Sequence, residues 1–263
     1  MAMTTERVGL YRLLAWLSPS FPTGAFSYSH GLEAAIAEGK VRDRASLEAW
    51  VAAIVALGSG RTDADILRDA YRAAQAHDIS AFDTANRRGV AFRPTAELAL
   101  ESAQQGEAFL AAYEAAWAAP HPDPLPARGE RESGGVSATN APLPARGERE
   151  GPTPQAWEGE GLQRQVCHAA VFGAAAARAG IALEDALLGY LQAFAVNLVS
   201  AGLRLGLVGQ TDGQRVLAAL EPVVAAAASA AMTRDPADFG ASTVAADLAS
   251  MAHETQYTRL FRS

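Results

Sequence analysis

Apolar residues recur along most of this chain at the three- and four-residue spacings of one α-helix face. The clearest examples are Leu47, Trp50, Val51, Ile54 and Val55, followed by Ile66, Leu67, Ala70, Tyr71 and Ala74. No run combines two-residue alternation with the β-branched enrichment that is typical of a strand. The pattern therefore predicts an all-α fold, a single-domain bundle of about eight to ten helices over residues 1–263.

Further helices are predicted over residues 85–119, 162–179, 183–208, 212–232 and 243–254. The first is broken near Arg93-Pro94, and we expect Pro94 at a first helical position, where proline is tolerated. Residues 183–208 are apolar on most sides, which is typical of a helix at the centre of a bundle. Because Gln192, Asn197 and Ser200 interrupt this run, we predict a buried core helix rather than a membrane span.

Residues 120–155 differ in composition from the rest of the chain. They hold eight of the 13 prolines, and the sequence Pro-Leu-Pro-Ala-Arg-Gly-Glu-Arg-Glu occurs at 124–132 and again at 142–150. Two copies are too few for a repeat fold, which needs further units to bury an apolar face. The composition predicts a disordered low-complexity insert whose deletion leaves the fold intact. A polyproline recognition segment is the alternative.

A segment rich in proline, glycine, serine and aromatic residues separates the first two helical patterns, Leu17-Ser-Pro-Ser-Phe-Pro-Thr-Gly-Ala-Phe-Ser-Tyr-Ser-His-Gly-Leu-Glu33. Pro19 cannot continue a helix, and Gly24 permits backbone angles that are closed to other residues. Ser27 or Ser29 could cap the next helix. The segment predicts a shaped loop whose aromatic side chains either seal the core or are presented to a partner. These side chains are Phe21, Phe26 and Tyr28.

The other end of the chain is an apolar and basic tail, His253-Glu-Thr-Gln-Tyr-Thr-Arg-Leu-Phe-Arg-Ser263. Large apolar residues in such a position need a surface to cover them. Folding back on the body of the protein is one interpretation. Tyr, Phe and Arg are also favoured in interface cores, so residues 254–263 are the second candidate docking segment.

These two segments, together with Gly209-Gln-Thr-Asp-Gly-Gln-Arg-Val-Leu217, resemble the urease accessory protein UreF family in sequence and in order. The resemblance covers nearly the whole chain apart from residues 120–155, which UreF-like chains do not need. It implies a helical adaptor, not an enzyme, that bridges UreD (also called UreH) and the GTPase UreG so that nickel is inserted into the urease apoprotein. It also implies a homodimer, and a tail that docks to UreD. The partner-binding residues that we expect are Phe21, Phe26, Tyr28, His30, Glu33, Gln256, Tyr257, Arg259, Leu260, Phe261 and Arg262.

The segment from Gly209 to Gly213 has two glycines but lacks the lysine of a phosphate-binding loop, so we interpret it as a turn. Thr211 is the expected N-cap of the following helix, with Gln214 completing the spacing of a capping box. A role for Arg215 at a partner's nucleotide site is an alternative, and it would make the protein a regulator of GTP hydrolysis by UreG.

Charge and cysteine content narrow the partners. The net charge of −7 favours neither nucleic acid nor an anionic membrane. The only lysine, Lys40, is followed by Val41 and not by the Ser or Thr of a P-loop, so GTP is expected to be handled by a partner. Cys167 is the only cysteine, which suits a reducing compartment, and no secretory signal begins the sequence. We therefore expect a cytoplasmic protein.

Candidate chemistry is sparse. The five histidines show no pair at i and i+4, so we expect no metal or other cofactor bound by this chain itself. Cys167-His168 is the best local pair and leaves a nickel carrier as a lesser alternative, but adjacent helical residues point about 100° apart. A serine hydrolase would use Ser27 or Ser29 with His30, yet Ser27 occupies the first glycine position of the G-x-S-x-G motif. No enzyme is predicted.

Overall fold

The computed structural model describes residues 5–118 and 165–263, which contain helices and connecting loops and no strand. The helices are α1 (Thr5–Trp16), α2 (Leu32–Ala37), α3 (Arg44–Leu57), α4 (Ser59–Gln75), α5 (Ile79–Ala91), α6 (Ala96–Ala116), α7 (His168–Arg178), α8 (Leu183–Arg204), α9 (Gln210–Thr233) and α10 (Val244–Glu254). The all-α prediction is confirmed. The predicted insert at 120–155 lies outside the described residues, and its disorder stays a prediction.

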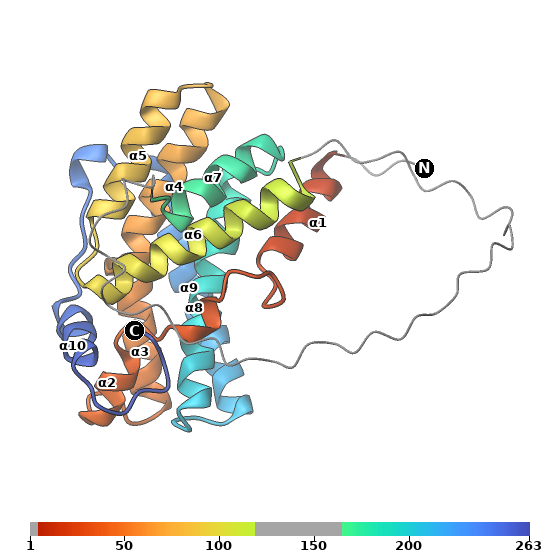
Figure 1. Cartoon of the computed structure of the whole chain (residues 1–263). Helices are drawn as coiled ribbons and strands as arrows, with labels where there is room; N and C mark the ends of the chain where they lie inside the picture. The colour runs from red at the N-terminus through yellow and green to blue at the C-terminus, as the bar shows by residue number, and fades with distance from the viewer. Residues whose placement is uncertain (1–4, 119–164) are drawn as a thin grey trace, which may run out of the picture.

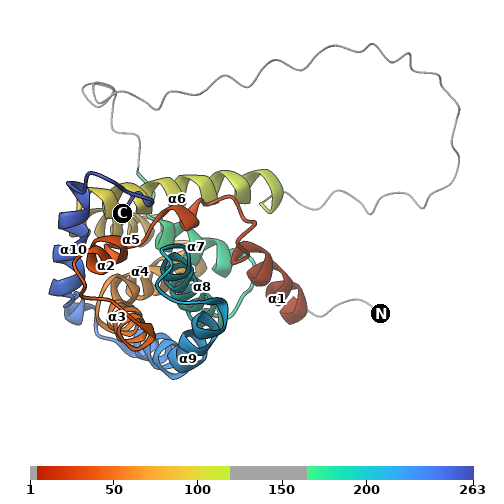
Figure 2. The ribbon, with the colours of Figure 1, turned by 90° about the horizontal axis from the view of Figure 1, so that it is seen from below.

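Helix α8 lies at the centre of the bundle, as its apolar sequence predicts. It packs against α2, α3, α4, α7 and α9, and Figure 2 shows these helices around it. Helix α6 crosses one side of the bundle, while α1 and α10 lie at opposite ends of the molecule in both views (Figures 1 and 2). The two outer helices therefore face different surroundings.

Several helices begin at side chains that cap them. Asp43 accepts a hydrogen bond from the Ser46 N–H ahead of α3, and Thr95 accepts one from the Leu98 N–H ahead of α6. Two predictions of helix starts are wrong. Pro94 precedes the cap Thr95 and is outside the helix. Helix α9 begins at Gln210, one residue before Thr211, and its N-cap is Gly209, because the Gly213 N–H already donates to the Gly209 carbonyl at 2.9 Å.

An aromatic cluster anchors α1 to the body. The Trp16 ring makes edge contacts with the rings of Phe109, Tyr113 and Trp117 of the α6 region and of Phe172 in α7, at centroid distances of 5.6–6.2 Å. Such edge-to-face pairs add about 0.5–1.5 kcal/mol each beyond the burial of area. Because Trp16 ends α1, the cluster fixes the point where the following loop begins.

Buried ion pairs hold the central helices together. Arg68 of α4 is 1% exposed and donates to the Ala231 carbonyl of α9 at 2.7 Å, beside Asp65. Asp63 of α4 pairs with Arg93, which follows α5, at 2.8 Å. Buried charges of this kind are costly unless paired, so these contacts fix how the helices lie against one another.

Two described helices, α8 and α9, are long and apolar enough to cross a membrane by length and composition. Core helices of other proteins pass the same test, so this is weak evidence for a span. Half of the tested window of α8 is buried inside the protein, in agreement with the prediction of a core helix.

Candidate functional site

The loop between α1 and α2, residues 17–31, is shaped by residues with left-handed backbones. Gly24 has φ 73° before a 3-10 turn, and His30 and Gly31 follow with φ 53° and 73° at the start of α2. A Cβ atom on Gly31 would lie 2.6 Å from the Ser250 backbone nitrogen of α10. Glycine is therefore needed here both for its conformation and for the close approach of α10.

The tail, which we define as residues 255–263, returns to this loop and pairs with it. The Ser29 N–H donates to the Ser263 carbonyl at 2.7 Å, and the Arg262 N–H donates to the Ser27 carbonyl at 2.8 Å. The Ser29 hydroxyl also contacts the Ser263 carbonyl and accepts the Glu33 N–H of the first turn of α2 at 3.4 Å, although the N-cap residue itself is Gly31. The structure thus brings together two of the three segments that carry the family resemblance.

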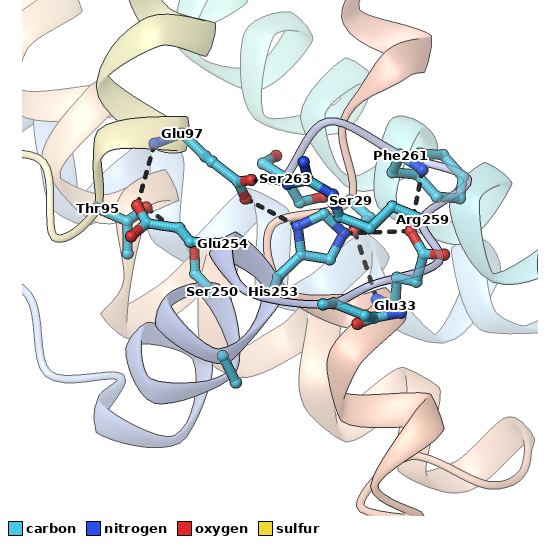
Figure 3. A network of polar contacts seen from close by, with 12 residues as sticks. Ser29, Glu33, Thr95, Glu97, Ser250, His253, Glu254, Arg259, Phe261 and Ser263 are labelled. Atoms are coloured by element: carbon cyan, nitrogen blue, oxygen red, sulfur yellow. Dashed lines mark hydrogen bonds and ion pairs between the residues drawn. The ribbon is translucent and has the colours of Figure 1, made fainter.

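The Glu33 carboxylate binds the backbone of the tail. Its two oxygens accept the backbone N–H groups of Leu260 at 2.7 Å and Phe261 at 2.9 Å, and His253 Nε2 lies 3.2 Å from Oε2 (Figure 3). Hydrogen bonds to an ionised acceptor contribute about 1.5–3 kcal/mol each, roughly twice a neutral one. Glu33 is therefore the residue that fixes the path of the tail.

His253, which is fully buried, extends this network to α6. Its Nδ1 lies 2.8 Å from Glu97 Oε2, and Arg259 of the tail lies beside the other Glu97 oxygen (Figure 3). Both ring nitrogens thus face carboxylate oxygens, which cannot donate when ionised. Both contacts can be hydrogen bonds only if both ring nitrogens of His253 carry a proton, or if one of the two carboxyl groups carries one. The network ties α2, α6, α10 and the tail into one unit.

A second buried network lies on the other side of the loop. His30 Nε2 is 3.0 Å from Glu101 Oε1, which also accepts from Gln105 Nε2 at 2.8 Å, and Ser263 Oγ donates to Glu101 Oε2 at 3.3 Å. The Tyr28 hydroxyl donates to Gln104 Oε1 at 2.6 Å. Burial, followed by the nearby Glu101 charge, raises the pKa of Tyr28. The loop is thereby fixed to α6.

The predicted partner-binding residues divide into three groups by exposure. Tyr28, His30, Glu33 and Phe261 are buried. Phe21 and Gln256 are half-buried. The exposed residues are Phe26, Tyr257, Arg259, Leu260 and Arg262. The buried group positions the loop and tail, and the exposed group is available to another protein.

One part of the tail folds back on the body of the protein and another part is exposed, so the structure contains features of both interpretations of its sequence. Phe261 folds back on the body, where the Arg204 guanidinium lies 4.4 Å from its ring centroid. Tyr257 is fully exposed and Leu260 is 62% exposed. Phe21 of the loop likewise packs inward, with its ring centroid 5.2 Å from that of Phe109. Partner binding by the exposed side chains stays a prediction.

Two helices present exposed apolar stripes that were not among the expected site residues. On α10, Val244, Leu248 and Met251 are 47–67% exposed and lead into the exposed tail. On α1, Leu10, Tyr11 and Leu14 are 56–64% exposed. Their spacing of three and four residues was readable in the sequence, but it does not distinguish an outward stripe from an inward one.

Cys167 and His168 contact different groups, and no group of three or more potential metal ligands occurs in the described part of the chain. The buried Cys167 sulfur lies 3.2 Å from Arg93 Nη2, while His168 Nδ1 faces the Tyr190 hydroxyl at 3.5 Å. Burial lowers the pKa of His168 to about 4, and the Arg93 charge adds to this effect while Asp63 opposes it. The two side chains therefore face different neighbours, but Cys167 is the N-cap of α7 with an extended backbone, so the 100° spacing of adjacent helical residues is not the reason.

Sequence reasoning missed the residues that hold the loop and tail from other helices, namely Glu97, Glu101, Arg204 and the role of His253. In the sequence, Glu97 stands out only as an acid near a predicted helix start. His253 stands out only as the first residue of a His-Glu pair, which lacks the second histidine of the zinc-binding motif H-E-x-x-H. Their partners are between 57 and 220 positions away. No local signal marks contacts over such separations.

The chain is similar in sequence to known proteins along nearly its whole length. The family model for UreF matches residues 41–221. A urease accessory protein UreF of Azorhizobium caulinodans is 43% identical over 263 residues, covering 100% of this chain and 99% of that protein. A UreF of Bradyrhizobium sp. strain ORS 278 is 41% identical over 258 residues, covering 98% and 93%. With a matching family model over more than half of its length and relatives this similar along nearly all of it, the chain belongs to the UreF family of urease accessory proteins.

Proposed function

We propose that this protein is a cytoplasmic, non-enzymatic adaptor that promotes nickel insertion into the urease apoprotein by bridging UreD (UreH) and the GTPase UreG. The observation that supports an adaptor role most directly is the placement of exposed apolar side chains on two separate surfaces, one suited to UreD and one to a second copy of the chain. One comprises Val244, Leu248 and Met251 of α10 with Tyr257 and Leu260 of the tail, and we call it the α10–tail surface. The other is the α1 stripe at the opposite end of the molecule (Figure 1).

Exposed apolar patches of this kind mark interaction sites in proteins that are otherwise well packed. The α10–tail surface is also rigidly held, because Glu33, His253 and Glu97 fix the tail beneath it. A preformed surface avoids much of the ordering cost that a free tail would meet on binding. We assign UreD to this surface.

The α1 stripe is assigned to a second copy of the chain, which would make the adaptor a homodimer. A C2 dimer uses the same patch on both subunits, and an exposed Leu10, Tyr11 and Leu14 stripe is suited to pack against itself. In this arrangement the two UreD sites lie away from the dimer interface. Nickel and GTP are handled by the partners.

The test is co-purification of the chain with UreD and UreG. Substituting Leu248, Tyr257 and Leu260 with serine is expected to abolish the capture of UreD and to leave the oligomeric state unchanged. Serine at Leu10, Tyr11 and Leu14 is expected to do the reverse, giving monomers that still capture UreD. If both triple variants bind UreD and dimerise like the unmodified chain, the assignment is wrong.

A GTPase assay separates the adaptor from a regulator of GTP hydrolysis. An adaptor leaves the turnover of UreG unchanged when the chain is added at saturating concentration. A regulator that supplies an arginine in trans would change the rate by orders of magnitude. Arg215, which is exposed and pairs with Asp212 at 2.9 Å, is the residue to substitute if the rate changes.

A further inference from the structure

A pocket of about 320 Å³ lies beneath the loop between α1 and α2, with further walls from the end of α1 and from α6, α7 and α8. Ligand pockets in proteins span about 300–1,000 Å³, so this space is large enough for a small molecule or one large side chain. The lining residues Pro19, Phe26 and Gln192 are exposed, whereas Trp16 and Phe172 are buried. The pocket therefore runs from the surface into the core.

Aromatic side chains form a large part of the apolar wall of this pocket. They come from the end of α1, the loop, α7 and α8, and they are Trp16, Phe21, Phe26, Phe172, Tyr190 and Phe194. Aromatic rings attract a further ring in edge-to-face or offset arrangements, in addition to the effect of burial. The wall therefore favours an aromatic ligand over an aliphatic ligand of the same size.

His168 supplies a polar group whose proton position is fixed by its neighbours. The Asp63 carboxylate pairs with Arg93 at 2.8 Å and accepts from the Tyr190 hydroxyl, whose oxygen lies 3.2 Å from Asp63 Oδ2. Burial raises the pKa of Tyr190 well above its ordinary value, so this hydroxyl keeps its proton. Because the proton is directed to Asp63, the Tyr190 oxygen accepts from His168 Nδ1, which lies 3.5 Å away. The proton of a neutral His168 ring therefore lies on Nδ1.

The other ring nitrogen of His168 is an accessible acceptor. His168 is uncharged near neutral pH, because burial lowers its pKa to about 4. With the ring proton on Nδ1, Nε2 carries a lone pair. Nε2 makes no hydrogen bond with the described residues and is not one of their buried unsatisfied atoms, so solvent reaches it. Since His168 lines the pocket, the pocket offers one neutral acceptor to a ligand.

The charges around the pocket favour a neutral ligand. Glu101 lies in the wall, so an anion would be repelled there. The Glu101 oxygens already accept from Gln105 Nε2 at 2.8 Å and from Ser263 Oγ at 3.3 Å, so this carboxylate does not require a further donor. A cation beside His168 would meet the same loss of hydration that keeps the imidazole uncharged.

We propose that this pocket binds an aromatic ring that carries one O–H or N–H donor, with the ring against the aromatic wall and the donor on His168 Nε2. Phenols and indoles have this chemistry. A tyrosine or tryptophan side chain of a bound protein offers the same group. The inference does not depend on the proposed function, because the isolated chain contains the whole pocket.

The first experiment titrates the isolated full chain with p-cresol while the imidazole ¹⁵N NMR signals are recorded. p-Xylene is the matched probe, because it has the same shape with a methyl group in place of the hydroxyl. We expect a saturable shift of the His168 Nε2 signal with p-cresol, and an affinity about fivefold higher than that of p-xylene, as one neutral hydrogen bond gives. 4-Methylanisole, which accepts but does not donate, should bind no better than p-xylene. Equal affinities of p-cresol and p-xylene, or no saturable binding of p-cresol, overturn the proposal.

Two variants test whether the probe binds in this pocket. His168→Leu should lower the affinity for p-cresol to that for p-xylene, while the matched variant His77→Leu, at an exposed histidine, should leave it unchanged. Ala193→Phe should fill the space and abolish the binding of both probes. Because Ala193 is only half-buried, this variant keeps the test decisive if His168→Leu does not fold. If Ala193→Phe binds p-cresol with unchanged affinity, the probe binds elsewhere and the proposal is wrong.

The complex with UreD and UreG distinguishes the two sources of the ring. A complex that binds p-cresol as tightly as the isolated chain supports a free small molecule as the ligand. A complex that excludes p-cresol, and that Ala193→Phe fails to form, supports an aromatic side chain of a partner. If the unmodified chain does not assemble with these proteins, the proposed function is wrong, while the titration of the isolated chain still decides whether the pocket binds an aromatic donor.

Discussion

Glu33→Gln is the substitution that tests most directly how the tail is held. The unmodified carboxylate accepts two backbone N–H groups of the tail at 2.7 and 2.9 Å and faces His253 at 3.2 Å. Glutamine keeps one carbonyl oxygen but replaces the other with a donor, which then opposes the Phe261 N–H or His253. At least one charge-assisted bond of about 1.5–3 kcal/mol is lost, and a buried N–H is left without an acceptor.

The loss is bounded by the free energy that docks the tail. Once the tail has left the body of the protein, the loss of further tail contacts does not lower the stability any more. The docking free energy that can be lost includes the burial of the Phe261 side chain, which contributes roughly 1.5–3 kcal/mol. We therefore expect tail docking to weaken by at least about 2 kcal/mol, a factor of about 30 in the equilibrium. Unfolding of the whole bundle should change less, because the packing of α8 on α3, α4 and α9 does not involve the tail.

Hydrogen exchange measures this effect at the tail itself. The amides of Leu260, Phe261 and Arg262 should exchange about 30-fold faster in Glu33→Gln, while those of α8 stay protected. Glu38→Gln is the matched control, since Glu38 ends the same helix and makes only an exposed contact with Lys40. Unchanged protection of the tail amides in Glu33→Gln would refute the role assigned to this carboxylate.

Three further outcomes are expected. The free energy of unfolding, measured with urea, should fall by about 3 kcal/mol as the pH drops from 6.5 through the His168 pKa of about 4, because the unfolded state binds the proton of His168 more readily than the folded state. His168→Gln should remove this contribution to the pH dependence. Gly31→Ala should destabilise by more than about 2 kcal/mol through its clash with α10, whereas Gly24→Ala, with the same φ and open space around it, should cost only about 1 kcal/mol, as measured by thermal unfolding. Arg93→Met should cost about 3–5 kcal/mol by leaving the Asp63 carboxylate buried without its cation and with the Tyr190 hydroxyl still donating to it, and the double variant with Asp63→Leu should recover much of this loss in the same denaturation assay.

The residues that carry the family resemblance were visible in the sequence because short motifs are local. The proline, glycine and serine residues between positions 17 and 33 indicate that a helix ends and a shaped loop begins, and this prediction does not depend on the rest of the chain. Helical periodicity likewise specified an all-α protein and identified α8 as a core helix. Helix starts were predicted less well, since Pro94 lies one residue before the N-cap Thr95 and Thr211 is the second residue of α9 instead of its N-cap.

The tail shows where local reasoning stopped. Its apolar side chains needed a cover, and the sequence could not decide between the protein's own body and another protein. The structure divides them, burying Phe261 under Arg204 and leaving Tyr257 and Leu260 exposed.

The sequence by itself determined the helical class and the family, and it singled out the loop between α1 and α2 and the tail as candidate docking segments. The tertiary structure alone decided that these segments meet, because Glu33, His253 and Glu97 are joined across 156 and 220 positions of the chain. Only folding brings such groups within hydrogen-bond distance, and whether a polar residue is a surface charge or a buried clamp depends on that approach.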